Sequence, residues 1–203
     1  MTLALIDFGA GNLRSVANAL AAAGADDVRV TADPADVRGA DRIVLPGVGA
    51  FGACRDALAA IPGMIDALDA RVRRDAVPFL GICVGMQLLA DTGEELGRHD
   101  GLGWIPGTVR RLPDRANARV PHMGWNDVKP DRAHPLLPPG EAYFLHSYAF
   151  DPADPADRLA ATDHAGPVTA AIGRDTIVGV QFHPEKSQAY GLAFLSRFLA
   201  WRP

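Results

Sequence analysis

The sequence contains little cysteine, little lysine and no long apolar run. Cys54 and Cys83 are too few for a disulfide framework or a cysteine-based metal site. Lysine occurs only at Lys129 and Lys186, and a net charge of −4 gives no basic surface for nucleic acid. No apolar stretch approaches the roughly 20 residues that cross a bilayer, and the N-terminus lacks a cationic leader pattern. We therefore expect a cytoplasmic protein that binds neither nucleic acid nor membrane.

The order of expected elements predicts an α/β protein. Its 203 residues suit one domain, 1–203, with a substantial core. Short apolar strands alternate with helical patterns over the first half, as in a doubly wound parallel sheet. Short β-rich pieces follow from about residue 107 and are expected to extend that sheet as a mixed one. The expected strands are 3–8, 28–31, 41–45, 77–80, 108–112, 119–121, 125–128, 142–144, 147–150, 159–162, 168–173 and 176–180.

Other local expectations concern helices and loops. Helices are expected to follow Asn12, which can cap the first of them, and to span 63–74 and 189–201. The last of these would bury one face, made of Leu192, Leu195, Phe198 and Leu199. The stretches 91–100 and 129–140 read as an exposed polar segment and a proline-rich loop.

Cys83 lies in a short motif typical of a nucleophile on a sharp turn. The apolar run Val77–Leu80 predicts a buried strand, and helical spacing begins at Val84. Between them Gly81 and Gly85 flank Cys83 at the spacing of a strained strand-to-helix turn, where larger neighbours would collide. A helix N-terminus would also favour the thiolate. The alternative is that Cys83 is a small buried apolar residue.

A second strand end carries three glycines within the sequence Pro46-Gly-Val-Gly-Ala-Phe-Gly52. Glycine lets the backbone turn its N–H groups toward one point. Such a segment serves as an oxyanion hole in acyl transfer, where N–H donors meet the developing negative charge. A plain flexible loop explains the glycines equally well.

A third strand end supplies a base and an acid. His183 follows the expected strand 176–180, and histidine is the side chain best suited to move protons near neutral pH. Glu185 could hold its second ring nitrogen, as the third member of a Cys-His-acid triad does. His122 and His146 lie among aromatic residues and suit structural roles, whereas His99, His134 and His164 occupy polar stretches. No histidine spacing fits a metal site, so we expect no metal.

The three motifs together resemble the class I glutamine amidotransferases. The match covers the chain from the first strand to the last helix, and further segments are similar to the glutaminase subunits of imidazole glycerol phosphate synthase. Those segments are Asp7–Ser15, Pro46–Phe51, Pro121–Asn126, Tyr143–Tyr148 and His183–Ser187. The resemblance implies a single-domain flavodoxin-like fold, a mixed and mostly parallel sheet with helices on both faces, and no cofactor.

The resemblance also implies a reaction. Cys83 would attack the carboxamide of glutamine to give a glutamyl thioester, and His183 would take the thiol proton and return it to ammonia. Glu185 would orient His183, and water would release glutamate. The implied oxyanion hole combines the N–H of Val84 with the segment around Val48 and Gly49. In addition, Gln87 would contact the glutamine substrate.

Members of this family work with a separate cyclase subunit, a (β/α)₈ barrel. By resemblance, this chain would form a heterodimer with such a barrel and pass it ammonia, giving imidazole glycerol phosphate and the aminoimidazole carboxamide ribonucleotide. The implied interface residues are Asn12, Trp125, Tyr143 and Lys186. There are two alternatives. One is a glutaminase subunit for anthranilate or pyridoxal phosphate synthesis, and the other is a catalytically silent binding module of the same fold.

Overall fold

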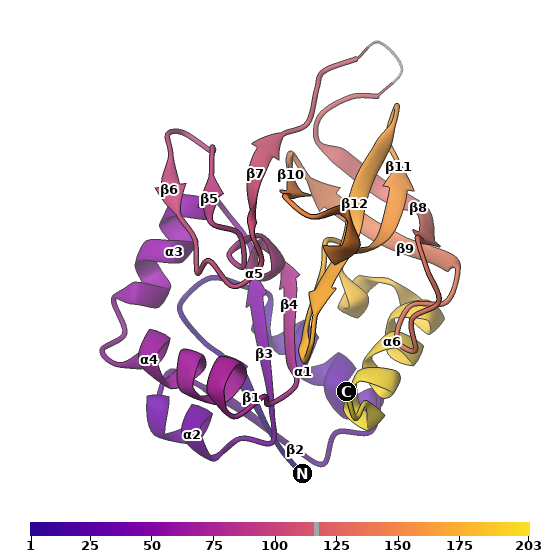
Figure 1. The fold of residues 1–203 in the computed structure, drawn as a ribbon. Helices are drawn as coiled ribbons and strands as arrows, with labels where there is room; N and C mark the ends of the chain where they lie inside the picture. The colour runs from indigo at the N-terminus through magenta and orange to yellow at the C-terminus, as the bar shows by residue number, and fades with distance from the viewer. Residues whose placement is uncertain (116–117) are drawn as a thin grey trace.

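The fold is built around a nine-stranded sheet. A computed structural model describes residues 1–115 and 118–203 of this fold (Figure 1). In the order of the sheet, the strands are β2 (Asp27–Thr31), β1 (Thr2–Ile6), β3 (Arg42–Gly47), β4 (Phe79–Cys83), β13 (Ile177–Val180), β12 (Pro167–Arg174), β11 (Arg158–Asp163), β8 (His122–Pro130) and β9 (Gly140–His146).

A second, four-stranded sheet lies beside the first. Its strands, again in order, are β10 (Tyr148–Pro152), β7 (Gly107–Arg111), β5 (Thr92–Gly93) and β6 (His99–Asp100). The helices are α1 (Leu13–Ala22), α2 (Pro34–Gly39), α3 (Phe51–Ala59), α4 (Met64–Leu68), α5 (Val84–Gln87) and α6 (Gln188–Ala200), with a π-helical turn at Asp69–Arg74 and 3-10 turns at Pro155–Asp157 and Pro184–Lys186.

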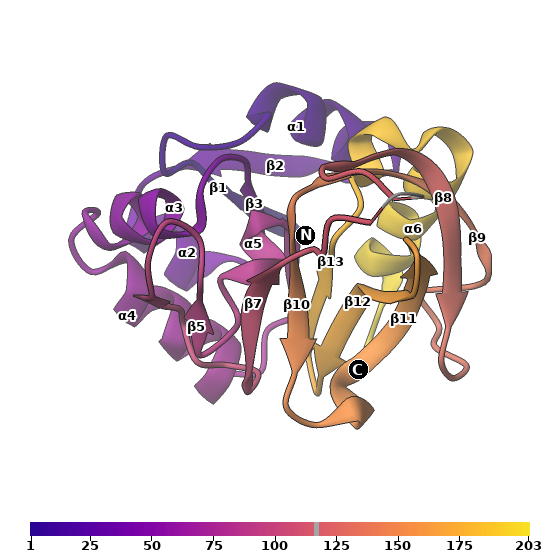
Figure 2. The same ribbon diagram turned by 90° about the horizontal axis from the view of Figure 1, so that it is seen from above.

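The first five strands of the large sheet are parallel and form its core. Every residue of β3, β4 and β13 is buried, as expected of strands covered on both faces. Helices α1 and α6 cover one face, and α2, α3 and α4 cover the other (Figure 2). The predicted α/β architecture is therefore confirmed. The carboxyl ends of β3 and β4 meet beneath α5 (Figure 1), which brings the two predicted glycine-rich motifs together.

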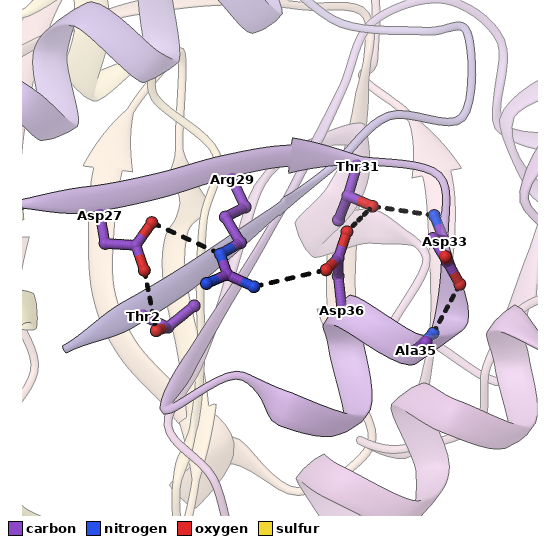
Figure 3. Close-up of polar contacts among 7 residues, drawn as sticks. All are labelled: Thr2, Asp27, Arg29, Thr31, Asp33, Ala35 and Asp36. Carbon is purple, nitrogen blue, oxygen red and sulfur yellow. Dashed lines mark hydrogen bonds and ion pairs between the residues drawn. The ribbon is translucent and has the colours of Figure 1, made fainter.

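Helix α2 is absent from the elements expected from the sequence. Asp33 begins it, because its side chain accepts a hydrogen bond from the Ala35 N–H at 2.8 Å, and Pro34 occupies the first turn. The hydroxyl of Thr31 contacts Asp36 at 2.7 Å and so ties the helix to the end of β2 (Figure 3). A six-residue helix has too little periodicity to be recognised, but the Asp-Pro start is a usable sequence feature.

The β-rich second half divides between the two sheets. Strands β12, β11, β8 and β9 extend the large sheet in antiparallel fashion, as predicted, but β7 and β10 pair with each other in the second sheet. The expected strand 119–121 does not form, since Pro121 has no N–H for a ladder. The stretch 91–100 is also not simply exposed: Thr92 and Gly93 are buried in β5, where Gly93 lies against the Phe51 ring.

Three helical expectations need correction. Asn12 precedes α1, but its side chain makes no capping hydrogen bond. The helix expected over 63–74 is α4 followed by the π-helical turn. In α6 the buried face includes Phe194, whereas Leu192 is 38% exposed, because the helix is turned slightly from the predicted orientation. The loop expected from 129 begins after Pro130, since β8 extends to that residue.

Among the residues that the structure describes, no helix is long and apolar enough to cross a membrane.

Candidate active site

Cys83 lies on a strained turn between β4 and α5. Its φ of 54° and ψ of −113° are values that a residue with a side chain rarely adopts. The flanking glycines are required by close approach: a Cβ on Gly85 would lie 1.8 Å from the Leu45 oxygen, and one on Gly81 would lie 2.6 Å from the Gly85 oxygen. The glycine spacing thus predicted the turn for the correct physical reason.

The helix after this turn is shorter than the sequence pattern indicated. Helix α5 ends at Gln87, and Leu88 and Leu89 continue as a turn. Four residues contribute only a small dipole, so the expected stabilisation of a thiolate by a helix N-terminus is weak here. A direct donor is present instead. The amide of Gln181 donates to Cys83 Sγ at 3.6 Å.

His183 and Glu185 form a buried pair beside Cys83. His183 Nδ1 donates to Glu185 Oε1 at 2.8 Å, and the exposed fractions of the two side chains are 4% and 2%. With Nδ1 engaged, Nε2 is the ring nitrogen left for the Cys83 thiol. The structure therefore brings together the three residues predicted as a triad, in the relative arrangement that a base and its orienting acid require.

The environment of His183 favours its protonated form. Burial lowers the pKa of His183, but hydrogen bonds to Cys83 and Glu185 and the negative charges of both groups outweigh it and raise the pKa to about 9. By contrast, burial raises the pKa of the Cys54 thiol to about 11, with further contributions from Cys83 and Glu95. Cys54 is therefore the unreactive cysteine.

Gln87 belongs to a buried chain of amides that ends at the nucleophile. Its Nε2 donates to Gln181 Oε1 at 2.9 Å and to the Tyr148 carbonyl at 3.0 Å. Both N–H groups of this amide are thus engaged, which leaves its oxygen as the group that can meet a ligand. Gln181 has no exposed surface and was not singled out from the sequence, although it lies two residues before His183 on the same chain segment.

The glycine-rich segment after β3 lies against the same turn. A Cβ on Gly47 would lie 2.9 Å from the Gly85 nitrogen, so the two motifs approach closely. The Cys54 thiol donates to the Val48 carbonyl at 3.5 Å, and Gly49 has a φ of +114°. The Phe51 N–H donates to Glu95 Oε2 at 2.7 Å. These contacts give the segment a defined shape rather than that of a free loop.

One cavity of about 310 Å³ contains most of the predicted site. Six of the seven predicted catalytic, oxyanion and substrate-binding residues line it, and Glu185 lies behind His183. These six are Val48, Gly49, Cys83, Val84, Gln87 and His183. The sequence did not indicate Glu95, Leu145 or Tyr148 as part of its wall. A separate cavity of about 350 Å³, lined by several arginines, contains none of the predicted site residues.

Three of the four predicted interface residues form one surface cluster. Trp125 and Tyr143 are paired across β8 and β9 with ring centroids 6.3 Å apart, and Lys186 Nζ lies 5.7 Å from the Tyr143 ring centroid. Trp125 is 48% exposed. Asn12 is also exposed, at the start of α1, which packs against the turn Pro184–Lys186.

A cysteine on a strained turn beside a buried His–Glu pair is the geometry of an acyl-transfer enzyme. The family model for class-I glutamine amidotransferases matches residues 4–200. The chain therefore belongs to the class I glutamine amidotransferase family. Two solved structures share the fold: a "glutamine amidotransferase" (TM-score 0.76, 18% identity, 98% of this chain and 99% of that chain) and a "putative gmp synthase subunit a protein" from Thermoplasma acidophilum (0.71, 21%, 98% and 92%).

Curated relatives narrow the assignment. The "Imidazole glycerol phosphate synthase subunit HisH" of Zymomonas mobilis is 64% identical over 206 residues, which cover 100% of this chain and 97% of that protein. The protein of the same name from Rhodospirillum rubrum is 55% identical over 215 residues, which cover 100% of this chain and 100% of that protein. Within its class, the chain belongs to the HisH family.

Proposed function

We propose that this chain is the glutaminase subunit of an imidazole glycerol phosphate synthase and that Cys83 is its nucleophile. The observation that carries the proposal is the convergence of three separate strand ends on one cavity, with Cys83 on a strained turn and His183 paired with buried Glu185 at 2.8 Å. A nucleophile, a base and an orienting acid in this arrangement suit attack on an amide carbonyl, which supports the proposal.

In the proposed reaction, His183 takes the thiol proton of Cys83 first and holds it on Nε2, and Cys83 Sγ then attacks the side-chain carboxamide carbon of glutamine. The resulting oxyanion is stabilised by the N–H of Val84 and by the segment of Val48 and Gly49. His183 then gives its proton to the leaving nitrogen, so that ammonia departs and a glutamyl thioester remains. Water hydrolyses the thioester, and glutamate leaves Cys83 free as thiol.

The oxygen of Gln87 is the group placed to recognise the substrate. Because its N–H groups are bound by Gln181 and Tyr148, Gln87 can only accept a hydrogen bond from a ligand. Glutamine offers such donors in its carboxamide and ammonium groups. We propose no cofactor and no metal for this chemistry, and we treat 1–203 as one glutamine amidotransferase domain.

The ammonia product is consumed by a partner in this proposal. The partner is a cyclase subunit with a (β/α)₈ barrel, and the complex is a heterodimer that works in the cytoplasm, a compartment suited to two free cysteines. The proposed contact surface for the cyclase subunit consists of four residues: Asn12, Trp125, Tyr143 and Lys186. An exposed aromatic pair with a neighbouring cation is the composition expected of an interface centre.

Glutamate release from glutamine tests the proposal, measured with this chain alone and with the cyclase subunit and its nucleotide substrate. We expect little glutamate release from the free chain and strong stimulation by the partner. The activity should be lost in Cys83→Ala and retained in the control variant Cys54→Ser, which keeps a donor for the Val48 carbonyl. Glutamate release by Cys83→Ala at the wild-type rate would refute the nucleophile, and no release by any form would refute the glutaminase assignment.

A further inference from the structure

A buried pair of histidines lies next to the proposed glutamine site and is used by no step of the reaction. His122 and His146 face each other across β8 and β9, with His122 Nδ1 2.9 Å from His146 Nε2. Their exposed fractions are 4% and 6%. His146 lines the site cavity, whereas His122 does not. A buried polar pair without a catalytic task requires a physical explanation.

The hydrogen-bond partners fix which nitrogen of each ring carries the proton. His146 Nδ1 lies 2.8 Å from the Tyr148 carbonyl, which can only accept, so the proton is on Nδ1. In the neutral ring Nε2 must then accept, and it accepts from His122 Nδ1. His122 Nε2 accepts in turn from Asn126 Nδ2 at 3.0 Å.

Asn126 sets the direction of the whole chain. Its Oδ1 accepts from the Asp127 N–H at 2.8 Å, so its nitrogen is the atom that faces His122. The same nitrogen donates to the Asp163 carbonyl at 2.8 Å. All hydrogen bonds therefore run one way, from Asn126 through His122 and His146 to Tyr148. Reversing any one of them would leave two donors or two acceptors opposed in a buried place.

Both imidazoles remain neutral at working pH. Burial lowers the pKa of His122 to about 4, with a contribution from His164, whose ring stacks on it at 4.3 Å. Burial also lowers the pKa of His146 to about 3, where the hydrogen bond to Tyr148 opposes it and the charges of His122, His164 and His183 add to it. A proton added to either Nε2 would also disrupt the hydrogen bond that this nitrogen accepts.

The end of this chain is the carbonyl that holds Gln87. Tyr148 accepts from His146 and from Gln87 Nε2, at 2.8 and 3.0 Å. The backbone from His146 to Tyr148 also forms the corner between the two sheets, because it leaves β9 in the large sheet and enters β10 in the small one. The hydrogen bond from His146 in β9 to Tyr148 in β10 spans this corner and fixes the carbonyl to which the Gln87 amide donates.

We propose that His122 is a positioning residue for the glutamine site, held in one tautomer by Asn126. Through His146 it fixes the Tyr148 carbonyl, and thereby the Gln87 amide with its oxygen available to the substrate. The inference relies on the proposed glutaminase function for its kinetic test only. Its spectroscopic test depends on the geometry alone.

The spectroscopic test is the tautomer of each ring, measured by long-range ¹H–¹⁵N correlation on histidine-labelled protein. We expect the Nδ1–H form at both His122 and His146. This form is distinctive, since a solvated neutral histidine favours the other one. An Nε2–H form at either residue, or a charged ring at about neutral pH, would overturn the proposal.

The kinetic test compares His122→Asn with His122→Leu in the complex with the cyclase subunit. Asn can still donate to His146, whereas Leu cannot, so His146 Nε2 loses the donor that holds the ring with Nδ1–H toward the Tyr148 carbonyl. Loss of such a buried hydrogen bond predicts a KM for glutamine raised about tenfold in the Leu variant, a smaller change in kcat, and a KM within about threefold in the Asn variant.

His134→Asn and His134→Leu are matched controls, because His134 lies in the loop 131–139 and outside the site cavity. Equal KM values for the two His122 variants would contradict the proposal. If the Leu variant does not fold, the tautomer measurement decides. A wild-type complex without glutaminase activity would refute the proposed function instead, and would leave the tautomer result standing.

Discussion

Gln181 Nε2 lies 3.6 Å from Cys83 Sγ and is its only side-chain donor of amide type among the described residues. The same amide accepts from Gln87 at 2.9 Å, so the substrate-binding residue and the nucleophile are joined by a single buried side chain. A fully buried amide in this position supports the thiolate directly, because hydrogen bonds to a charged acceptor are stronger than neutral ones.

Replacing Gln181 by methionine should therefore make Cys83 less reactive. Methionine keeps the length of the side chain and removes both the donor and the acceptor. A lost hydrogen bond to a charged group, about 1.5–3 kcal/mol, predicts at least a tenfold slower alkylation of Cys83 by iodoacetamide at about pH 7. Mass spectrometry of the modified peptides provides the rate. Gln188→Met, at an exposed position, is the control, and an unchanged rate in Gln181→Met would argue against the contact.

The titration of His183 provides a second prediction. Its pKa is raised to about 9 by Cys83 and Glu185 in spite of burial, whereas an unfolded chain has the ordinary value of 6.5. A raised folded-state pKa stabilises the protein fully below pH 6.5, and this contribution is lost as the pH rises through 9. The stability advantage of the wild type over Glu185→Gln should thus shrink between these pH values.

Chemical denaturation of both proteins across that pH range measures the difference. Glu185→Gln should also reduce kcat in the assembled complex by about a hundredfold or more, since general acid–base catalysis contributes about that much. Glu94→Gln is a suitable control because Glu94 is exposed. A stability difference that does not vary with pH would show that the pair does not set the titration of His183.

How far the site could be predicted depends on whether its residues are close in sequence. Gly81, Cys83 and Gly85 form a local turn, so their spacing contains the geometric requirement. His183 and Glu185 are likewise near neighbours at one strand end. The contacts of Gln181 with Cys83 and Gln87 span more than 90 residues and arise only because β4 and β13 are adjacent. No local pattern records such an adjacency.

The same distinction between local and distant contacts explains which parts of the fold could be predicted from the sequence. Strands of the parallel core were recognisable because they are short, apolar and buried on both faces. The division of the β-rich half into two sheets was not, because it depends on pairings such as Tyr148 with Arg111, which local composition does not specify. The missed helix α2 is the exception, since Asp33 and Pro34 provide a local start that periodicity alone overlooks.

Gly85→Ala should abolish stable folding, because a Cβ there would lie 1.8 Å from the Leu45 oxygen, with backbone on both sides and little freedom to move. We expect the thermal transition to be lost or lowered by well over 10 °C, on the basis that about 1 kcal/mol shifts Tm by roughly 2–4 °C at this size. Gly39→Ala is the matched control. Nothing lies within 4 Å of its Cβ position in α2, so it should be neutral or slightly stabilising.

The last prediction concerns a buried arginine that holds the C-terminal helix. Arg42, 2% exposed at the start of β3, donates to the Leu199 carbonyl at 3.0 Å and to the Trp201 carbonyl at 2.6 Å. Its guanidinium also lies 5.6 Å from the centre of the Phe198 ring. Arginine thus satisfies carbonyls that the end of α6 leaves without intrahelical partners.

Arg42→Met should lower the free energy of unfolding by about 2–4 kcal/mol, because two carbonyls lose a charged donor while the apolar stem is retained. Denaturant unfolding followed by circular dichroism measures it. Arg29→Met, which removes an exposed arginine from β2, should change stability by less than about 1 kcal/mol. Equal effects of the two substitutions would mean that α6 is held by the packing of Phe194 and Phe198 alone, without help from the contacts of Arg42.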